Sequence, residues 1–362
     1  MSLIENIIRP DVRALDAYHV PDSAGFLKLD AMENPYRLPE NMQKKLGEHL
    51  AEVALNRYPV PSYTELKAKI RETLGIPPGY DVIVGNGSDE LIVIVSTALA
   101  RQDRRAKVLA PVPTFVMYAL SAQFAGMEFV GIPLKADFSL DMDAMLDAIR
   151  VQRPSVLYLA YPNNPTGNLF DLEDMLALIE AMKDIGIVIS DEAYQPFAQT
   201  SMMSYLPKYP NLVVMRTVSK LGLAGVRLGY MSASSELLAE FDKVRPPYNV
   251  NVLTEAAVTF ALDHIDVFNR QAAALRGERE TLSAALSALP GIEVLPSSAN
   301  FVLVRLENAD TVFEKLLAKK ILIKNVGKMH ILLDNCLRIT VGTPEENKQF
   351  LELFSACLSQ PV

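Results

Sequence analysis

The sequence has no tryptophan, only two cysteines and no cluster of basic residues, and each shortage excludes a class of protein. Cys336 and Cys357 lie in no CxxC pattern and have no histidine at ligand spacing, so neither a disulfide framework nor a metal site is expected. No run of lysine and arginine exceeds two residues, and 35 basic against 43 acidic side chains give a net charge of −8. No nucleic-acid partner is expected, because such proteins present a basic stripe interleaved with aromatic rings.

Long apolar runs are also missing. The longest uncharged apolar run in the first third of the chain, Leu91 to Ala100, has ten residues, whereas about 18 are needed to span a bilayer. Residues 1–16 carry charges throughout and lack the apolar stretch of a secretory signal. We therefore expect a cytoplasmic protein without membrane contact, in which this run forms a buried helix.

The chain does contain enough apolar material for a large core, since half of its 362 residues are hydrophobic. At roughly 150 residues per domain, this length suggests two domains. Between about residues 80 and 232, short apolar runs alternate with helical stretches, which predicts an α/β fold with a mostly parallel sheet covered on both faces. Seven runs are predicted as strands: Val82–Val84, Val108–Ala110, Phe129–Ile132, Val156–Ala160, Ile187–Ser190, Val213–Met215 and Arg227–Met231.

After residue 265 the pattern changes to a long helix followed by separated strands, which indicates a smaller α+β domain. Thr343, Pro344 and Glu346 form a capping box with a proline at the first position, and they predict the start of the last helix. We expect an N-terminal arm over residues 1–35, a large domain over 36–265 and a small domain over 266–362. The strands predicted in the small domain are Phe301–Leu306, Ile321–Lys324 and Leu337–Val341.

Two segments that follow predicted strands can hold a ligand, because ligands bind at the carboxyl ends of parallel strands. GNGSDE (Gly85–Glu90) precedes an apolar helix, so its free N–H groups could bind a phosphate, although Gly-Asn-Gly is also an ordinary turn. NNPTG (Asn163–Gly167) either points the Asn164 amide at a ligand or is a loop that starts the next helix.

The third segment, SDEAYQ, places Asp191 at the end of a buried strand, where a carboxylate needs a cation, a metal or N–H donors. Asp191 could instead cap a helix, and Tyr194 could face the same ligand. The fourth segment, TVSKLGLAGVRLGY, puts Thr217 and Ser219 beside Lys220. A lysine at a strand end is most often a surface residue, but hydroxyls and a glycine-rich turn around Lys220 favour chemistry.

Together the four segments fit one ligand that has a phosphate, a ring in need of a counter-charge and a carbonyl that reacts with an amine. That ligand is pyridoxal phosphate. Six motifs in collinear order from about Tyr18 to Pro344 resemble the histidinol-phosphate aminotransferases, which are class II, fold type I pyridoxal-phosphate enzymes with an aspartate-aminotransferase-like large domain. The motifs are GNGSDE, PTFVMY, NNPTG, DEAY, TVSK with LAGVRLGY, and NCLRITVGTP.

The resemblance implies a role for each residue around the cofactor. Lys220 would hold it as a Schiff base and shuttle a proton, with its pKa lowered by ~3 units through burial and a nearby cation. Asp191 would pair with the ring nitrogen, Asn164 and Tyr194 would bond the ring oxygen, and Phe115 would stack on the ring. The phosphate would contact Gly87, Ser88, Asp89, Thr217, Ser219, Arg227 and, from the neighbouring subunit of a homodimer, Tyr58.

Substrate contacts are implied as well. Arg338 would grip the carboxylate of glutamate or the phosphate of histidinol phosphate, in a pocket lined by Tyr18, Asn34, Tyr58 and Asn164. Lys324 stands where the family often has a second arginine, and Arg37 stands where glycine is common. A lysine lacks the fork of a guanidinium, so phosphate affinity depends on this replacement.

The implied reaction is ping-pong transamination of L-histidinol phosphate with 2-oxoglutarate, which gives imidazole-acetol phosphate and L-glutamate. Two alternatives use the same cofactor, namely an aminotransferase for aromatic or other amino acids and a decarboxylase or lyase. A pyridoxal-phosphate sensor without turnover is the alternative from another class.

Overall fold

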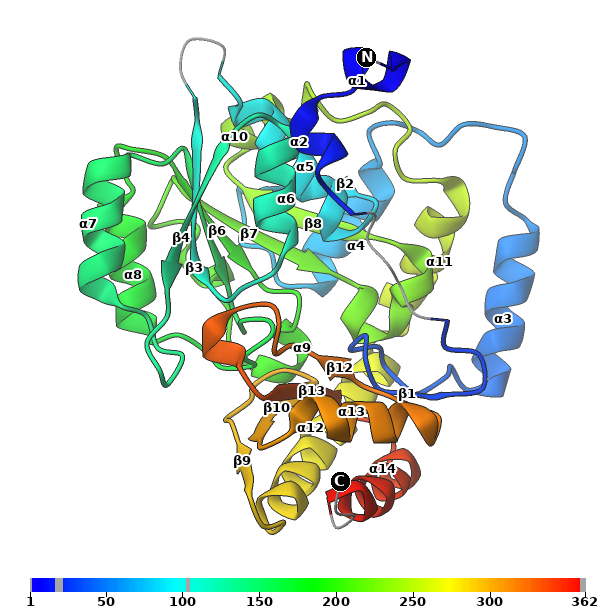
Figure 1. Cartoon of the computed structure of the whole chain (residues 1–362). Helices are drawn as coiled ribbons and strands as arrows, with labels where there is room; N and C mark the ends of the chain where they lie inside the picture. The colour runs from blue at the N-terminus through cyan, green and yellow to red at the C-terminus, as the bar shows by residue number, and fades with distance from the viewer. Residues whose placement is uncertain (1, 17–21, 102–104, 359–362) are drawn as a thin grey trace.

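We describe a computed structural model, which covers residues 2–16, 22–101 and 105–358. Its centre is a seven-stranded sheet with the order β2-β8-β7-β6-β5-β3-β4, in which β8 runs antiparallel to both neighbours and the other pairings are parallel (Figure 1). The strands are β2 (Asp81–Gly85), β3 (Lys107–Val112), β4 (Glu128–Pro133), β5 (Val156–Ala160), β6 (Ile187–Asp191), β7 (Leu212–Thr217) and β8 (Gly229–Ala233).

All seven predicted strands are present, and the mostly parallel sheet is confirmed. Several strand ends differ from the prediction by one or two residues. One of these differences has a clear cause, since the run expected to start at Arg227 becomes a strand only at Gly229. Arg227 has φ 56° and ends the turn between β7 and β8 in the left-handed region, where a strand cannot begin.

Both faces of the large sheet are buried, as near-continuous apolar strands require. Alternate residues of each strand enter two different hydrophobic clusters, so that Leu157 and Leu159 face one side while Tyr158 faces the other. Four helices cover the first face: α4 (Thr64–Thr73), α7 (Met142–Gln152), α8 (Leu172–Ala181) and α11 (Val252–Asp263). Three helices cover the second: α5 (Gly87–Leu99), α6 (Met117–Phe124) and α10 (Ser235–Asp242).

The C-terminal part forms a second, four-stranded antiparallel sheet with the order β12-β13-β10-β9. Helices α12, α13 and α14 pack against it around their own hydrophobic cluster, at the lower end of the molecule in Figure 1. The elements are α12 (Ile265–Ser287), β9 (Ile292–Val294), β10 (Phe301–Leu306), α13 (Ala309–Ala318), β11 (Ile321–Leu322), β12 (Lys324–Asn325), β13 (Cys336–Thr340) and α14 (Pro344–Leu358).

The predicted strand Ile321–Lys324 was wrong as one element, because the run changes partner at Ile323. Its first half, β11, pairs in parallel with β1 (Leu27–Lys28) from the N-terminal region, and its second half pairs with β13. The capping box at the last helix is confirmed, with the Thr343 N–H 2.8 Å from Glu346 Oε2 and the Glu346 N–H 3.2 Å from Thr343 Oγ1. The division into domains stays a prediction.

The remaining elements are short, except for α3. They are α1 (Leu3–Ile7), α2 (Pro10–Arg13), α3 (Glu40–Ala51), α9 (Gln195–Ala198) and the short helical turns η1 (Met203–Tyr205), η2 (Ser219–Leu223), η3 (Ala224–Val226) and η4 (Ile331–Leu333). No helix in the part of the chain described is long and apolar enough to cross a bilayer. Within these ranges, no three His, Cys, Asp or Glu side chains gather in a way that could hold a metal ion.

Candidate active site

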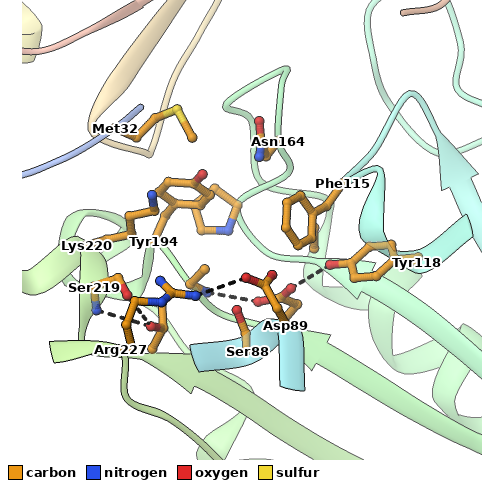
Figure 2. Close-up of a pocket in the computed structure, with 15 residues that line it drawn as sticks. Met32, Ser88, Asp89, Phe115, Tyr118, Asn164, Tyr194, Ser219, Lys220 and Arg227 are labelled. Carbon is orange, nitrogen blue, oxygen red and sulfur yellow. Dashed lines mark hydrogen bonds and ion pairs between the residues drawn. The ribbon is translucent and has the colours of Figure 1, made fainter. Parts of the chain in front are cut away.

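A pocket opens at the carboxyl ends of β5, β6 and β7, the edge of the sheet where the sequence predicts a ligand. Ten of the predicted site residues line it together, and they come from five separate segments of the chain (Figure 2). They are Ser88, Asp89, Phe115, Asn164, Asp191, Tyr194, Thr217, Ser219, Lys220 and Arg227.

One end of the pocket is built where β2 turns into α5. Gly87 starts this helix with φ 77°, and a Cβ atom there would lie 2.7 Å from Nη2 of Arg227. Gly229 on β8 is just as constrained, since its Cβ would lie 2.5 Å from the backbone carbon of Gly87. These two glycines let the guanidinium of Arg227 and the first N–H groups of α5 meet at one point, which suits an anion.

Arg227 is held at this point by Asp89, whose Oδ2 lies 3.1 Å from its Nη2. Both side chains are about half exposed, so the pair opens to solvent through the pocket and contributes little to folding stability. A bound phosphate would compete with Asp89 for the guanidinium.

The turn after β7 adds two hydroxyls beside the arginine. Thr217 Oγ1 lies 2.9 Å from Ser219 Oγ and 3.0 Å from the Leu228 carbonyl oxygen, and the Ser219 N–H donates back to Thr217 Oγ1 at 3.1 Å. The two hydroxyls therefore lie on the same side, as predicted. The tight turn η2, of the π-helical type that is frequent at functional sites, then delivers Lys220 into the pocket.

The amine of Lys220 loses its proton more easily than that of an ordinary lysine. Its Nζ donates to the Ala31 carbonyl oxygen at 2.9 Å and lies 6.0 Å from the centre of the Tyr194 ring. Burial is the main cause that lowers the pKa of Lys220 to about 8, and the positive charge of Arg338 is the next. The predicted lowering and both of its causes agree with the structure.

Asp191 closes β6 and is 4% exposed. Its carboxylate accepts from two neutral donors, the Tyr118 hydroxyl at 2.6 Å from Oδ2 and the Ala193 N–H at 3.2 Å from Oδ1. Burial raises the pKa of Asp191 to about 6, against the lowering by these hydrogen bonds. A protonated pyridine nitrogen would supply the cationic partner that such a carboxylate requires.

The next residue, Glu192, points to the other face of the sheet. Its Oε2 lies 2.9 Å from Nε of Arg216, and the Met202 N–H and the Ser201 hydroxyl also donate to its carboxylate. The DEAY motif thus combines one pocket carboxylate with one structural carboxylate, as the alternation of a strand requires.

The two asparagines of the NNPTG loop also differ in their surroundings. Asn163 is fully buried and ties the loop together through Thr114, the Pro113 carbonyl and Thr166. Asn164 lines the pocket instead, and its Oδ1 accepts from Nη1 of Arg338 at 2.6 Å. The second guanidinium nitrogen of Arg338 donates to the Asp30 carbonyl oxygen at 2.9 Å.

Six predicted substrate or phosphate contacts are not among the lining residues: Gly87 and Arg338, which are described above, and Asn34, Tyr58, Lys324 and Tyr18. Asn34 uses its amide to bind the Leu221 carbonyl and Gln271, and it receives the Tyr36 N–H. Tyr58 is 79% exposed. Lys324 lies opposite Arg338 in the β12–β13 pairing, and Tyr18 lies outside the described residues. The roles assigned to these residues, like those of the residues that line the pocket, stay predictions.

Five lining residues were not among the predicted ones, namely Met32, Tyr118, Ala160, Pro162 and Ala193. Two of them, Tyr118 and Met32, make contacts that explain their position. Tyr118 follows Phe115 by three positions at the start of α6, a spacing that brings both rings to one side, and their centres lie 5.6 Å apart at 86°. Met32 lines the pocket from the N-terminal segment, where its N–H bonds Thr340 Oγ1 and its carbonyl accepts from Asn300. The first could be found from helical spacing, whereas the second depends on a contact between distant segments.

The sequence is similar to those of known proteins. Residues 24–354 match the family described as aminotransferase class I and II. The chain is 60% identical to "Histidinol-phosphate aminotransferase 2" of Cupriavidus pinatubonensis, over 99% of this chain and 98% of that protein. It is 59% identical to "Histidinol-phosphate aminotransferase 1" of Ralstonia nicotianae, over 98% and 96% of the two chains.

A solved structure confirms the expected fold. The histidinol-phosphate aminotransferase of Sinorhizobium meliloti, solved in complex with pyridoxal 5′-phosphate, superposes with a TM-score of 0.85 over 97% of this chain and 96% of its own, at 23% identity. The family match and the full-length relatives place the chain in the class I and II aminotransferase family, among the histidinol-phosphate aminotransferases.

Proposed function

We propose that this protein transfers the amino group of L-histidinol phosphate to 2-oxoglutarate, with pyridoxal phosphate as its cofactor. The products are imidazole-acetol phosphate and L-glutamate, and the two substrates react in turn by a ping-pong mechanism. The observation that carries the proposal is the identity of 60% and 59% to relatives of that name, over nearly the full length of each chain.

The pocket fits pyridoxal phosphate at three points. The start of α5 with Arg227 and Ser219 suits the phosphate, the buried carboxylate of Asp191 suits the ring nitrogen, and the amine of Lys220 suits the aldehyde. Phe115 would lie against the ring, and the Asn164 amide and the Tyr194 hydroxyl would reach the ring oxygen. When bound, the cofactor supplies an electron sink that stabilises negative charge at the substrate Cα.

The chain's own residues then handle charge and protons. With the cofactor bound, the Lys220 amine would be the base that takes the proton from the substrate Cα and returns it at C4′ of the cofactor. A pKa of about 8 leaves part of the amine neutral at physiological pH, which this proton transfer requires. The negative charge of Asp191 would keep the ring nitrogen of the bound cofactor protonated.

Arg338 would recognise the acidic group of each substrate. Its side chain is 7% exposed, and its guanidinium is oriented by Asn164 and by the Asp30 carbonyl. A planar fork in this position can bind a carboxylate or a phosphate with two hydrogen bonds, so one residue can serve both half-reactions. Lys324, directly across the β12–β13 ladder, would add a second positive charge for the phosphate.

We further propose that the protein acts in the cytoplasm as a homodimer whose active sites lie at the subunit interface. The ring of Tyr58 stacks on Tyr248 at 4.6 Å and is 79% exposed, which is a large aromatic surface for a solvated position. In the dimer, the Tyr58 hydroxyl would reach the cofactor phosphate of the neighbouring subunit.

The test is to incubate the purified holoenzyme with L-histidinol phosphate and 2-oxoglutarate and to measure glutamate. We expect glutamate to form, with a higher kcat/KM for histidinol phosphate than for phenylalanine. A higher value for phenylalanine would make the protein an aromatic aminotransferase, and release of CO₂ or ammonia without a keto acid would make it a decarboxylase or lyase.

Two variants complete this experiment. Lys220→Ala removes the amine and is expected to abolish turnover, whereas Lys183→Ala, an exposed lysine that follows α8, is the matched control and keeps it. Turnover by Lys220→Ala equal to that of the control would contradict the assignment.

A further inference from the structure

Tyr118 is the pocket residue with the shortest hydrogen bond to Asp191, and it is entirely buried. It lies in the first turn of α6, and its hydroxyl donates to Oδ2 of Asp191 at 2.6 Å, the dashed contact at the right of Figure 2. A hydrogen bond this short to a carboxylate is of the charge-assisted kind, which is about twice as strong as a neutral one.

The ring of Tyr118 is fixed by its neighbours, so its hydroxyl has one position. It stacks on the Tyr158 ring from β5, with centres 4.4 Å apart and planes at 11°. Its edge meets the Phe115 ring at 86°, the ring that faces the cofactor position. Tyr118 thus contacts both Phe115, which would stack on the pyridine ring, and Asp191, which would bond the ring nitrogen.

We propose that Tyr118 is a positioning residue, which orients the Asp191 carboxylate toward the cofactor's ring nitrogen. With Oδ2 bonded to Tyr118 and Oδ1 to the Ala193 N–H, the carboxylate cannot rotate, and its remaining lone pairs face the pocket. This inference rests on the proposed function, since it assumes that pyridoxal phosphate occupies the pocket.

The protonation states support this arrangement. Burial and the negative charge of Asp191 raise the pKa of Tyr118 well above its ordinary value, so the phenol stays a donor at every physiological pH. In return, the hydrogen bond from Tyr118 lowers the pKa of Asp191, whereas burial and the charges of Asp89 and Glu192 raise it. Without this hydroxyl the carboxylate would be both less ionised and free to turn.

The chain offers a matched pair of variants for the test. Tyr118→Phe deletes the hydroxyl that bonds Asp191, and Tyr158→Phe deletes one from the stacked partner ring, which is equally buried. Each change removes a single oxygen atom from the same stack. Replacing Tyr118 with 3,5-difluorotyrosine provides a second probe, which keeps the hydroxyl and makes it a stronger donor.

Two measurements are made on each variant. The first is the dissociation constant of pyridoxal phosphate from the apoprotein, followed by absorbance. We expect Tyr118→Phe to weaken binding about tenfold or more, and Tyr158→Phe to weaken it far less. The second is the pKa of the Asp191 carboxyl in the cofactor-free protein, followed by carbon NMR. It should rise in Tyr118→Phe and fall with 3,5-difluorotyrosine.

Equal effects of the two phenylalanine variants on both measurements would overturn the proposal, and so would an Asp191 pKa that does not respond to fluorination. A wild-type protein that binds no pyridoxal phosphate would instead refute the proposed function, while the NMR titration would still decide whether Tyr118 controls Asp191.

Discussion

Burial shifts the pKa values of Lys220 and Asp191, two ionisable groups of the pocket, in opposite directions. It lowers the pKa of Lys220 to about 8 and raises that of Asp191 to about 6, so both are shifted toward neutral pH. An amine that loses its proton easily and a carboxylate that lacks a cationic partner are what a cofactor with an aldehyde and a basic ring nitrogen would require.

The pH dependence of cofactor binding follows from Lys220. Only the neutral amine reacts with the aldehyde, so the rate at which the apoprotein binds pyridoxal phosphate covalently should rise with pH to a plateau, with a midpoint near 8. Stopped-flow absorbance measures this rate. Arg338→Gln removes the positive charge that helps to lower the pKa of Lys220, so its midpoint should move upward. A midpoint above 10 in the unchanged protein would contradict the account.

Asp191 should make the free energy of unfolding of the apoprotein fall as pH rises. Its folded pKa of about 6 lies above the ordinary 3.8, so its favourable contribution is present below pH 3.8 and is lost as pH rises through 6. A difference of about 2 pKa units corresponds to about 3 kcal/mol. Asp191→Asn should therefore stabilise the cofactor-free protein at pH 8, and the gain should shrink at pH 5.

Urea unfolding of the apoprotein at the two pH values measures this gain, and Asp184→Asn, at an exposed position, serves as the control. Asp191→Asn should weaken pyridoxal-phosphate binding at the same time. If Asp191→Asn is less stable than wild type at pH 8, the buried carboxylate does not destabilise the folded apoprotein.

The pocket residues were predictable where they follow a strand and unpredictable where distant segments meet. Asp191, Ser219 and Lys220 stand at the ends of β6 and β7, a position that the apolar runs reveal directly. The contact between the Lys220 amine and the Ala31 carbonyl spans 189 positions in the sequence, and no local pattern indicates it. Side-chain direction was also hidden, since Asn34 bonds the backbone instead of lining the pocket.

At the scale of elements, the close approach of β8 to the start of α5 builds the phosphate end of the pocket. The antiparallel pairing of β8 with both β2 and β7 brings Gly229 against Gly87 and places Arg227 at the same corner. The positions of the α5 N-terminus and of the Arg227 guanidinium therefore depend on a contact between two glycines that leaves no room for a side chain.

Gly229→Ala tests this contact. Its new Cβ would lie 2.5 Å from the Gly87 backbone carbon and 2.6 Å from the Ser88 nitrogen, so one of the two elements must move. We expect a loss of about 1–3 kcal/mol in the free energy of unfolding, together with weaker pyridoxal-phosphate binding. Gly225→Ala in η3, which meets nothing within 4 Å, is the control. Equal effects of the two substitutions in urea unfolding would contradict the packing argument.

Element prediction was accurate for the large sheet and less so for the small one. Strands buried on both faces read as continuous apolar runs, and each of the seven was visible. The run Ile321–Lys324 looked the same but was divided, because β1 binds its first half and β13 its second. Only the partners of a strand determine such a division, and a single sequence does not contain them.

At the scale of the whole molecule, the proposed dimer makes each active site a shared structure. Lys220 would come from one subunit and Tyr58 from the other, so a lesion in either residue can be complemented. Lys220→Ala and Tyr58→Ala homodimers should each be impaired. After they are unfolded and refolded together, mixed dimers hold one site with both lesions and one intact site.

We expect such a mixture to recover about a quarter of wild-type activity, since about half of the dimers are mixed and each has one intact site. Light scattering should give a particle of two 40.0-kDa chains. Activity that never exceeds the mean of the two parent variants would show that each subunit carries its own complete site.

We propose that Lys220 forms the covalent bond to pyridoxal phosphate. Reduction of the holoenzyme with borohydride, followed by peptide mapping, shows which residue carries the cofactor. We predict that the pyridoxyl group is found on the peptide that contains Lys220, at one group per chain, and that Lys220→Ala yields no modified peptide. A pyridoxyl group on another lysine, or on none, would contradict the account.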